Sequence, residues 1–176
     1  MPDTALQPGF MESKIRVAAP LEAKLVSEIL SEAAQWLEGR GIPLWSPEQV
    51  SLATISPEVQ GGLYYLAWVR STAVGTMRLT DSDPAFWPEA VPGEALYLHR
   101  LAVRRAAAGG ELSSQLLRWA ASYAAVSGAR YLRLDCETFR HSLRGVYERF
   151  GFQFHSERVV RRAVVARYQL LCTQVA

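Results

Sequence analysis

The sequence has few of the residues that build disulfide frameworks or metal centres. Its 176 residues include 2 cysteines and 3 histidines. Cys136 lies in an apolar run and Cys172 lies four residues before the end, so we expect two free thiols rather than a disulfide. The histidines, at positions 99, 141 and 155, are too scattered for a zinc motif, and no metal cofactor is expected.

Long apolar runs and a strong net charge are also missing. No stretch reaches the ~18 apolar residues of a membrane span. Residues 1–13 lack the basic start and apolar run of a signal peptide. We therefore expect a cytoplasmic protein with no membrane partner. The formal net charge of +2 is too small to indicate a nucleic-acid partner.

What the sequence does contain is enough apolar residues for one core. It is 49% hydrophobic and 20% charged, which is typical of a single soluble domain. We expect residues 1–13 to form a loosely ordered tail and residues 14–176 to form one domain. Residues 1–99 carry 6 basic and 12 acidic side chains, whereas residues 100–176 carry 13 and 5. An anionic ligand is therefore expected in the second half.

Periodicity and turn residues predict the order of the elements. Helices are expected from Pro20 to Gly39, from the N-cap Ser46 until Pro57 and Gly61, from Gly110 to Gly128, and over 142–150. Strands are expected over 14–18, 63–69, 73–79, 95–103, 131–136, 152–155 and 163–170. This order predicts an α+β (mixed α/β) domain with a largely antiparallel sheet, in which strands 95–103 and 131–136 run parallel across a helical crossover.

The start of the third helix is a candidate anion site. Its free N–H groups and the positive end of its dipole attract anions, and Gly109-Gly110 lets a ligand approach the backbone. Arg104 and Arg105 add positive charge just before it. The alternative is a plain strand-to-helix turn in which glycine only provides tightness.

Two segments carry a resemblance to a known family. Residues 101–120 read LAVRRAAAGGELSSQLLRWA. They resemble the acetyl-CoA-binding segment of the GNAT acetyltransferase superfamily, LxVxPxxRGxGxGxxLL, without a gap. Val103, Gly109 and the pair Leu116-Leu117 coincide with the pattern. Residues 140–152, RHSLRGVYERFGF, are similar to its NxxALxxYExxGF segment, with Tyr147 and Gly151 aligned.

Several positions depart from the family pattern. Arg105 stands at the family's proline, Ala108 at its arginine or glutamine, Glu111 at its second glycine and Ser113 at its third. A glutamate where the backbone approaches the pyrophosphate either turns outward or repels the ligand. Arg140 replaces an asparagine, which puts a cation near the cofactor.

The resemblance implies a fold and a reaction. The fold would be a mostly antiparallel central sheet of six to seven strands with a splayed parallel pair, flanked by about four helices. The function would be acetyl transfer from acetyl-CoA, as cosubstrate, to a primary amine of an unidentified small-molecule acceptor by direct attack. The alternative is a catalytically weak GNAT-like acyl-CoA-binding or interaction module with a degenerate pyrophosphate loop. A homodimer stays open.

The resemblance also implies the residues of the site. Tyr147 would protonate the CoA sulfur, although it could instead be an aromatic anchor of its helix. Strand 95–103 would splay from its neighbour near residues 101–103 and free backbone N–H groups for the pantetheine. The implied cofactor-binding residues are Leu101, Ala102, Val103, Ala108, Gly109, Gly110, Glu111, Leu112, Ser113, Ser114, Arg140, Leu143 and Tyr147.

The candidate base and the acceptor site follow once the resemblance places the reaction centre beside strand 95–103. Strict alternation puts His99 on one strand face with Tyr97, Leu101 and Val103, so His99 is the candidate base. It could equally be a hydrogen-bonded core histidine, and Glu94 is the second candidate. Aromatic residues of the first two helices and the hairpin region would line the acceptor site: Trp36, Trp45, Tyr64, Trp68 and Trp87.

Overall fold

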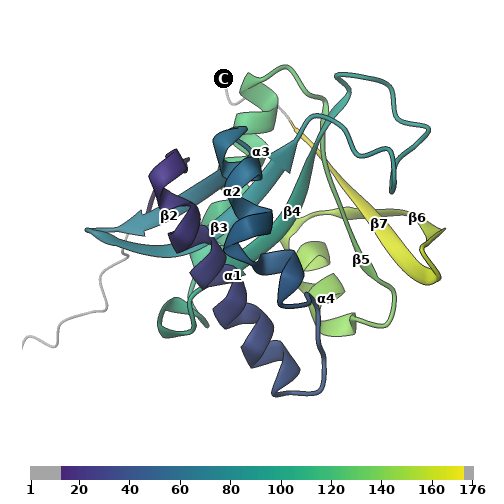
Figure 1. Ribbon diagram of the computed structural model, residues 1–176. Coiled ribbons are helices and arrows are strands. Elements are labelled where there is room, and N and C mark those ends of the chain that lie inside the picture. The colour runs from purple at the N-terminus through teal and green to yellow at the C-terminus, as the bar shows by residue number, and fades with distance from the viewer. Residues whose placement is uncertain (1–12, 173–176) are drawn as a thin grey trace, which may run out of the picture.

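A computed structural model describes residues 13–172 and shows one seven-stranded mixed sheet (Figure 1). The strand order is β1-β2-β3-β4-β5-β7-β6. The strands are β1 (Lys14–Val17), β2 (Tyr64–Val69), β3 (Thr72–Thr80), β4 (Ala95–Val103), β5 (Tyr131–Glu137), β6 (Gln153–Val160) and β7 (Ala163–Leu171). Only the β4–β5 pair is parallel among the described pairs, so the predicted fold class and element order are confirmed.

Four α-helices cover the sheet. They are α1 (Ala23–Glu38), α2 (Leu52–Gln60), α3 (Leu112–Val126) and α4 (His141–Phe150). Helices α1 and α2 bury Val26, Ile29 and Ile55 in one core cluster, whereas α3 buries Leu116 and Leu117 in another. The sheet therefore separates two cores. Within residues 13–172, no helix is long and apolar enough to cross a membrane.

The expected tail lies almost wholly outside the described residues. Its last residue, Ser13, is described, and its hydroxyl donates to Oε1 of Gln115 on α3 at 2.6 Å. The short strand β1 that follows pairs antiparallel with β2.

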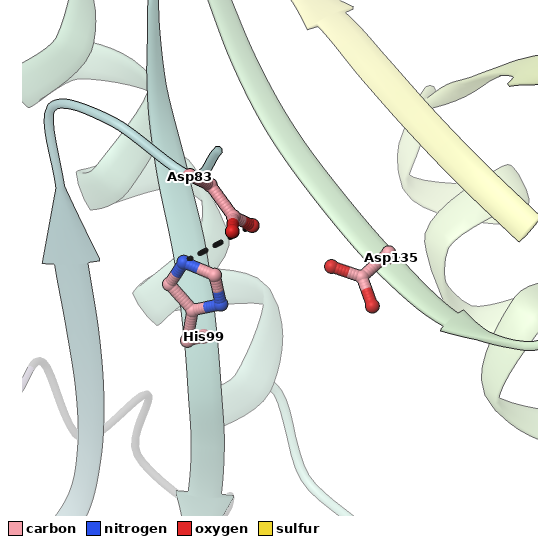
Figure 2. A group of neighbouring side chains, drawn as sticks. All are labelled: Asp83, His99 and Asp135. Carbon is pink, nitrogen blue, oxygen red and sulfur yellow. Dashed lines mark ion pairs between the residues drawn. The ribbon is translucent and has the colours of Figure 1, made fainter. Parts of the chain in front are cut away.

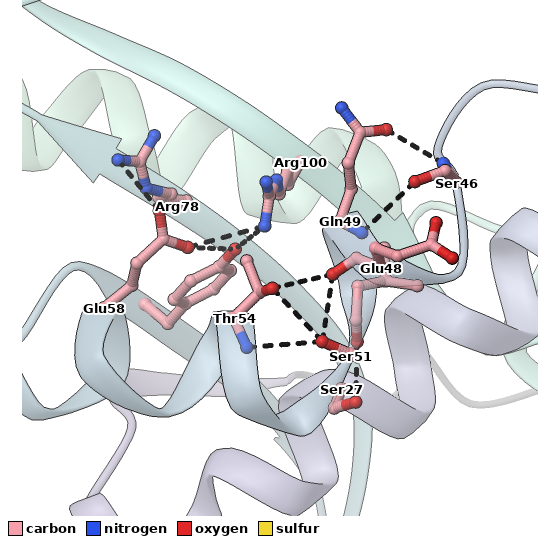
Figure 3. Close-up of polar contacts among 11 residues, drawn as sticks. Ser27, Ser46, Glu48, Gln49, Ser51, Thr54, Glu58, Arg78 and Arg100 are labelled. Carbon is pink, nitrogen blue, oxygen red and sulfur yellow. Dashed lines mark hydrogen bonds and ion pairs between the residues drawn. The ribbon is translucent and has the colours of Figure 1, made fainter.

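The second helix begins later than predicted and ends at Gln60, before the predicted Gly61. Ser46 and Gln49 cap each other, but they open only a 3₁₀ turn over Glu48–Val50. The α-helix begins after Ser51, whose hydroxyl accepts from the Thr54 N–H (Figure 3). Pro57 lies inside this helix rather than ending it. Packing overrides the helix-breaking tendency of proline here, because Ile55 and Val59 on either side are fully buried.

Strand β4 contains a β-bulge that sequence alternation did not predict. Arg100 has a φ of 49°, and the pairing with β3 shifts so that two residues of β4, Arg100 and Leu101, oppose Met77. Beyond the bulge, Leu101 packs in the same core cluster as Leu98, and Ala102 in the other cluster. The prediction that His99 shares a face with Leu101 and Val103 was therefore wrong.

The parallel pair β4–β5 separates after a short contact. Only Ala95, Leu96 and Tyr97 pair with β5, at Tyr131, Leu132 and Arg133. From Leu98 onward, β4 keeps its partner β3, whereas β5 continues beside β7. The predicted splay is present and begins closer to the start of β4 than residues 101–103.

Ion pairs join the acidic first half of the chain to the basic second half. Glu58 pairs with Arg100, Glu32 with Arg104 at 3.0 Å, Glu94 with Arg133, and Glu89 with Arg167. In each pair the acid comes from the first half and the arginine from the second. Four of the 13 arginines of the second half thus help to hold the two halves together.

The loop between β3 and β4, residues 81–94, is fastened to the far half of the sheet. Trp87 is 3% exposed, and the guanidinium groups of Arg133 and Arg167 lie 4.7 and 4.6 Å from its ring centre. Arg167 also donates to the carbonyl of Phe86 at 3.0 Å. These contacts fix the position of the loop residues that precede Trp87.

Candidate functional site

Two cavities lie on either side of the separated strands. The first, of about 340 Å³, lies between α1, the end of β4, the loop 105–110, the start of α3, and α4. The second, of about 400 Å³, lies between β4, β5, β7, the loop after α1, and the loop 81–94. Leu101, Leu143 and Tyr147 line both cavities. Ligands in the two cavities would therefore meet at these three residues.

The first cavity brings together nine of the predicted cofactor residues. They are Leu101, Ala102, Val103, Ala108, Gly109, Gly110, Ser113, Leu143 and Tyr147. Gly109 has a φ of +83°, and a Cβ built on either Gly109 or Gly110 would meet no atom within 4 Å. The loop before α3 is therefore open toward the cavity, as a backbone that receives a phosphate group requires.

The remaining four predicted cofactor residues lie outside this cavity. Leu112 is buried in the core under α3, and Ser114 lies one position beyond the lining residue Ser113. Glu111 is 59% exposed, and its carboxylate lies 3.6 Å from the guanidinium of Arg118 on α3. Of the two orientations considered for Glu111, the structure shows the outward one.

Arg140 is engaged away from the cavity. Its Nε donates to the Glu137 carboxylate at 2.7 Å, and its other nitrogens donate to the carbonyls of Ile42 and Pro43. The loop after α1 that it holds continues into Leu44 and Trp45, which line the second cavity. Arg140 thus fastens the wall of the second cavity.

A backbone donor faces the gap between β4 and β5. The N–H of Arg104 donates to the Val74 carbonyl of β3 at 2.8 Å. Successive N–H groups of a strand point to opposite edges, so the N–H of Val103 points away from β3. Since β5 has diverged at this level, this N–H is available to a ligand in the first cavity.

Tyr147 on α4 is a buried phenol between the two cavities. Its ring packs against Phe152 with 5.9 Å between ring centres. Burial raises the pKa of Tyr147 above its usual value, and the charges of Cys136 and Asp135 act in the same direction. The phenol therefore keeps its proton and can donate a hydrogen bond at the junction of the cavities.

His99 lies in the second cavity on β4. Its Nε2 is 3.3 Å from the hydroxyl of Thr80 and 3.8 Å from the carboxylate of Asp83. Burial, helped by the charges of Arg78 and Arg100, lowers the pKa of His99 to about 4. The imidazole is therefore neutral at physiological pH, and one ring nitrogen can accept a hydrogen bond. The other candidate base, Glu94, pairs with Arg133 at 3.0 Å, outside both cavities.

Two acidic residues next to His99 were not predicted from the sequence. Asp83, Asp135 and His99 place one ligand atom each within 4.8 Å of one another (Figure 2). Burial and the charge of Asp83 raise the pKa of Asp135 to about 7, although Arg167 opposes this. The signal for Asp135 was available, since it is the one acid inside the apolar run of β5, YLRLDC.

The predicted aromatic acceptor surface is dispersed. Trp45 lines the second cavity, whereas Trp36 lines the first. Tyr64 and Trp68 pack in the core beneath α1 and α2, and Trp87 holds the loop 81–94. Phe86, which was not predicted, joins Trp45 at the second cavity.

Comparisons with known proteins agree with this geometry. The sequence model of the Acetyltransferase (GNAT) family matches residues 30–152. The chain is 30% identical over 140 residues to the uncharacterized N-acetyltransferase YesJ of Bacillus subtilis (strain 168), covering 76% of this chain and 77% of the relative.

Solved structures share the fold of this chain. A GNAT-family acetyltransferase from Listeria monocytogenes superposes with a TM-score of 0.80 at 25% identity, over 94% of this chain and 98% of its own. The putative acetyltransferase yncA from Salmonella typhimurium, solved with its cofactor acetyl-CoA, gives a TM-score of 0.69 at 15% identity, over 94% and 96% of the two chains.

Proposed function

The chain belongs to the acetyltransferase (GNAT) family, and from this premise we propose that it transfers an acetyl group from acetyl-CoA to a primary amine of a small acceptor by direct attack. The observation that carries the proposal is the pair of cavities that share Leu101, Leu143 and Tyr147. Two ligands that enter from opposite sides of the splayed strands can come into contact there, without a covalent enzyme intermediate.

The first cavity suits acetyl-CoA. The open loop at Gly109 and Gly110 offers backbone N–H groups at the start of α3 to the pyrophosphate. The N–H of Val103 supports the pantetheine, since it points toward the gap left by β5. Glu111 is turned toward Arg118 and does not oppose the phosphates. Acetyl-CoA supplies the reactive thioester, and the remaining chemistry falls to residues of the chain.

The residues at the junction meet the needs of the reaction. The nitrogen–carbon bond forms as the carbon–sulfur bond breaks, so the departing sulfur needs a proton donor. Tyr147 is a buried phenol that keeps its proton, and it lines both cavities. An ammonium loses two protons on becoming an amide. One passes to a base and then to solvent, and the other replaces the proton that Tyr147 gives to sulfur.

His99 marks the side from which the amine approaches. It lies in the second cavity and its imidazole is neutral, so it can accept a hydrogen bond from the amine. With a pKa of about 4, it holds a transferred proton poorly at neutral pH. His99 is therefore proposed to orient the amine, with help from a stronger proton acceptor beside it.

Calorimetry with acetyl-CoA and a thiol assay test the proposal. We expect acetyl-CoA to bind with a micromolar dissociation constant, and a panel of primary amines to release CoA thiol at a rate that rises with amine concentration. Binding without thiol release for any amine would favour an acyl-CoA-binding module. No heat and no thermal shift at millimolar acetyl-CoA would contradict the proposed function altogether.

A further inference from the structure

We propose that Asp83, His99 and Asp135 together hold the ammonium group of the acceptor and that Asp135 receives its proton, an inference that rests on the proposed function. The three residues come from the loop 81–94, from β4 and from β5. Their ligand atoms lie within 4.8 Å of one another (Figure 2). His99 and Asp135 line the second cavity, whereas Asp83 approaches them from the adjoining hollow beneath the loop 81–94.

The spacing of the three side chains fits an ammonium nitrogen. Three atoms that lie no more than 4.8 Å apart leave a position within about 2.8 Å (4.8/√3) of all of them. This is the usual length of a charge-assisted N–H···O bond. A primary ammonium has three N–H donors, which matches three acceptors. The same three atoms could also hold a metal ion, so Zn²⁺ is included in the experiments below.

Among the three residues Asp83, His99 and Asp135, one acceptor atom lacks a hydrogen-bond donor in the described part of the chain. The Asp83 side chain is 10% exposed, and its Oδ2 is a buried atom without a hydrogen-bond donor among the described residues. Its Oδ1 accepts from the Phe86 N–H at 3.4 Å. A buried carboxylate oxygen without a donor is costly. Oδ2 lies 3.8 Å from Nε2 of His99 (Figure 2), so an ammonium bound beside His99 would supply the donor that Oδ2 lacks.

The loop that carries Asp83 is held firmly enough to keep this oxygen in place. Arg167 donates to the Phe86 carbonyl three residues later and pairs with Glu89. Trp87 lies between Arg133 and Arg167. The backbone N–H of Trp87 also donates to the Asp83 carbonyl at 2.7 Å. A fixed acceptor loses little freedom when it binds a ligand.

The group lies next to the junction of the two cavities. His99 and Asp135 line the second cavity together with Leu101 and Tyr147, which also line the first. An amine held by the group therefore projects into the same space as the phenol of Tyr147. The apolar side chains of Trp45, Phe86 and Leu98 line this cavity and would contact the carbon skeleton of the acceptor. The acceptor class is thus a primary amine on an apolar group.

The charges around the group make Asp135 the proton acceptor. Asp135 faces Asp83 from the loop and Arg167 from β7, and its pKa rises to about 7 because of burial and the Asp83 charge. His99 faces Arg78 of β3, Arg100 of its own strand and Asp83, and its pKa falls to about 4. When R–NH₃⁺ gives one proton to the Asp135 carboxylate, the neutral amine has a free electron pair for attack on the thioester.

Amine binding without turnover tests the site directly. The probes are n-butylammonium and n-butyltrimethylammonium, which share charge and chain but differ in N–H donors. The pKa of the Asp135 carboxyl is followed by ¹³C NMR in the protein without acetyl-CoA. We expect n-butylammonium to lower this pKa by at least half a unit and the trimethyl probe to leave it unchanged. Equal effects of both probes, or none, would overturn the proposal.

Variants separate this site from its neighbours. In the wild-type protein, n-butylammonium should also shift the NMR signals of the His99 ring, because the imidazole accepts one of its hydrogen bonds. Asp135→Asn and Asp83→Asn should each abolish this shift. Asp81→Asn, an exposed acid of the same loop, should retain it. Melting temperatures establish that each variant is folded, and Asp83→Asn carries the test if Asp135→Asn does not fold. Retention of the effect in both variants would overturn the proposal.

Two further measurements distinguish other outcomes. If micromolar Zn²⁺ binds the wild-type protein but not Asp135→Asn, and displaces n-butylammonium, the group is a metal site and the proposal is wrong. With a turned-over amine, Asp135→Asn should lower kcat/KM for the amine about 100-fold and leave acetyl-CoA affinity within twofold. If n-butylammonium binds as expected but no amine releases CoA thiol, the proposed function fails while the ammonium site stands.

Discussion

The two cavities are built in opposite ways. At the loop before α3, the first cavity is lined by small residues, such as Ala102, Ala108, Gly109, Gly110 and Ser113, and the side chains of α1 and α4 that complete it are mainly apolar. The second is lined by large and charged side chains, such as Trp45, Phe86, His99, Asp135 and Arg161. The first is drawn mainly from one stretch of sequence around β4 and α3. The second draws on at least four separate segments.

This difference assigns different tasks to the two cavities. A wall of backbone amides can receive any ligand with the same phosphate and amide groups, and it tolerates few side chains. A wall of side chains from several segments can change its shape and charge one residue at a time. The first cavity is thus suited to a common cosubstrate and the second to a particular acceptor.

The largest effect is expected from Gly109→Val, which should obstruct the first cavity and weaken acetyl-CoA binding. Gly109 has a φ of +83°, which a β-branched residue adopts only with strain, and the new side chain would enter the cavity. We expect acetyl-CoA affinity, measured by calorimetry, to fall about 1000-fold.

Gly93→Val is the matched control. Gly93 has a φ of +81° in the loop 81–94, away from the first cavity. This variant should lose similar stability and keep its acetyl-CoA affinity. A similar loss of affinity in both variants would show that the effect comes from general destabilisation.

Tyr147→Phe tests the junction that the two cavities share. Removal of the phenol leaves the buried ring and its contact with Phe152 in place. We expect kcat to fall about 100-fold, with acetyl-CoA affinity within threefold of wild type. Tyr123→Phe, a change on the partly exposed face of α3, is the control. An unchanged kcat in Tyr147→Phe would remove the phenol from the mechanism.

Asp135→Asn tests how much the buried Asp135 carboxylate lowers the free energy of unfolding. The folded-state pKa of Asp135, about 7, lies above its unfolded value of about 4. The folded protein therefore binds this proton more tightly, and the ionised carboxylate destabilises it increasingly as pH rises from 4 to 7. We expect the variant to exceed wild type in free energy of unfolding by about 1–2 kcal/mol at pH 8, and by little at pH 4.

Denaturant unfolding at pH 4, 6 and 8 measures this difference. Asp81→Asn serves as control, because Asp81 is an exposed acid of the same loop. If the stability of Asp135→Asn relative to wild type does not change with pH, the carboxyl group titrates equally in both states.

The smallest effect is expected at Glu111, the departure from the family pattern that would most weaken CoA binding if its carboxylate faced the phosphates. Glu111 occupies a glycine position of the family pattern, but it lies 3.6 Å from Arg118 and is 59% exposed. Glu111→Gln removes its charge and keeps its shape. We expect acetyl-CoA affinity to change less than twofold, and a tenfold gain would show that the carboxylate acts on the phosphates.

Local patterns predicted most of the fold, whereas the resemblance to the GNAT family implied most residues of the first cavity. Each of these predictions rests on a short stretch of sequence: the strand 95–103, the Gly109-Gly110 turn, and the spacing from Tyr147 to Gly151. Contacts within a short stretch depend little on the rest of the fold. Long-range effects were not predictable. The bulge at Arg100 reversed the faces of β4, and burial beside Ile55 kept Pro57 inside α2.

The second cavity was even harder to predict from the sequence, because its residues come from distant segments. Asp83 and Asp135 are 52 positions apart and meet only because the loop 81–94 is fastened to β5 and β7. Periodicity indicates that Asp135 interrupts an apolar strand, but it does not indicate what lies opposite. The charge asymmetry did not indicate the contacts between the halves, in which four arginines of the second half pair with acids of the first. The anionic ligand that it suggested stays a prediction.

The separation of β4 from β5 also affects how water reaches the interior. In a continuous sheet, a central-strand amide exchanges its hydrogen with solvent only when the protein opens. The amide of Val103 lies in a central strand, yet it points into the gap that β5 leaves. We therefore expect this hydrogen to exchange with solvent in the intact fold and to become protected when a ligand fills the gap.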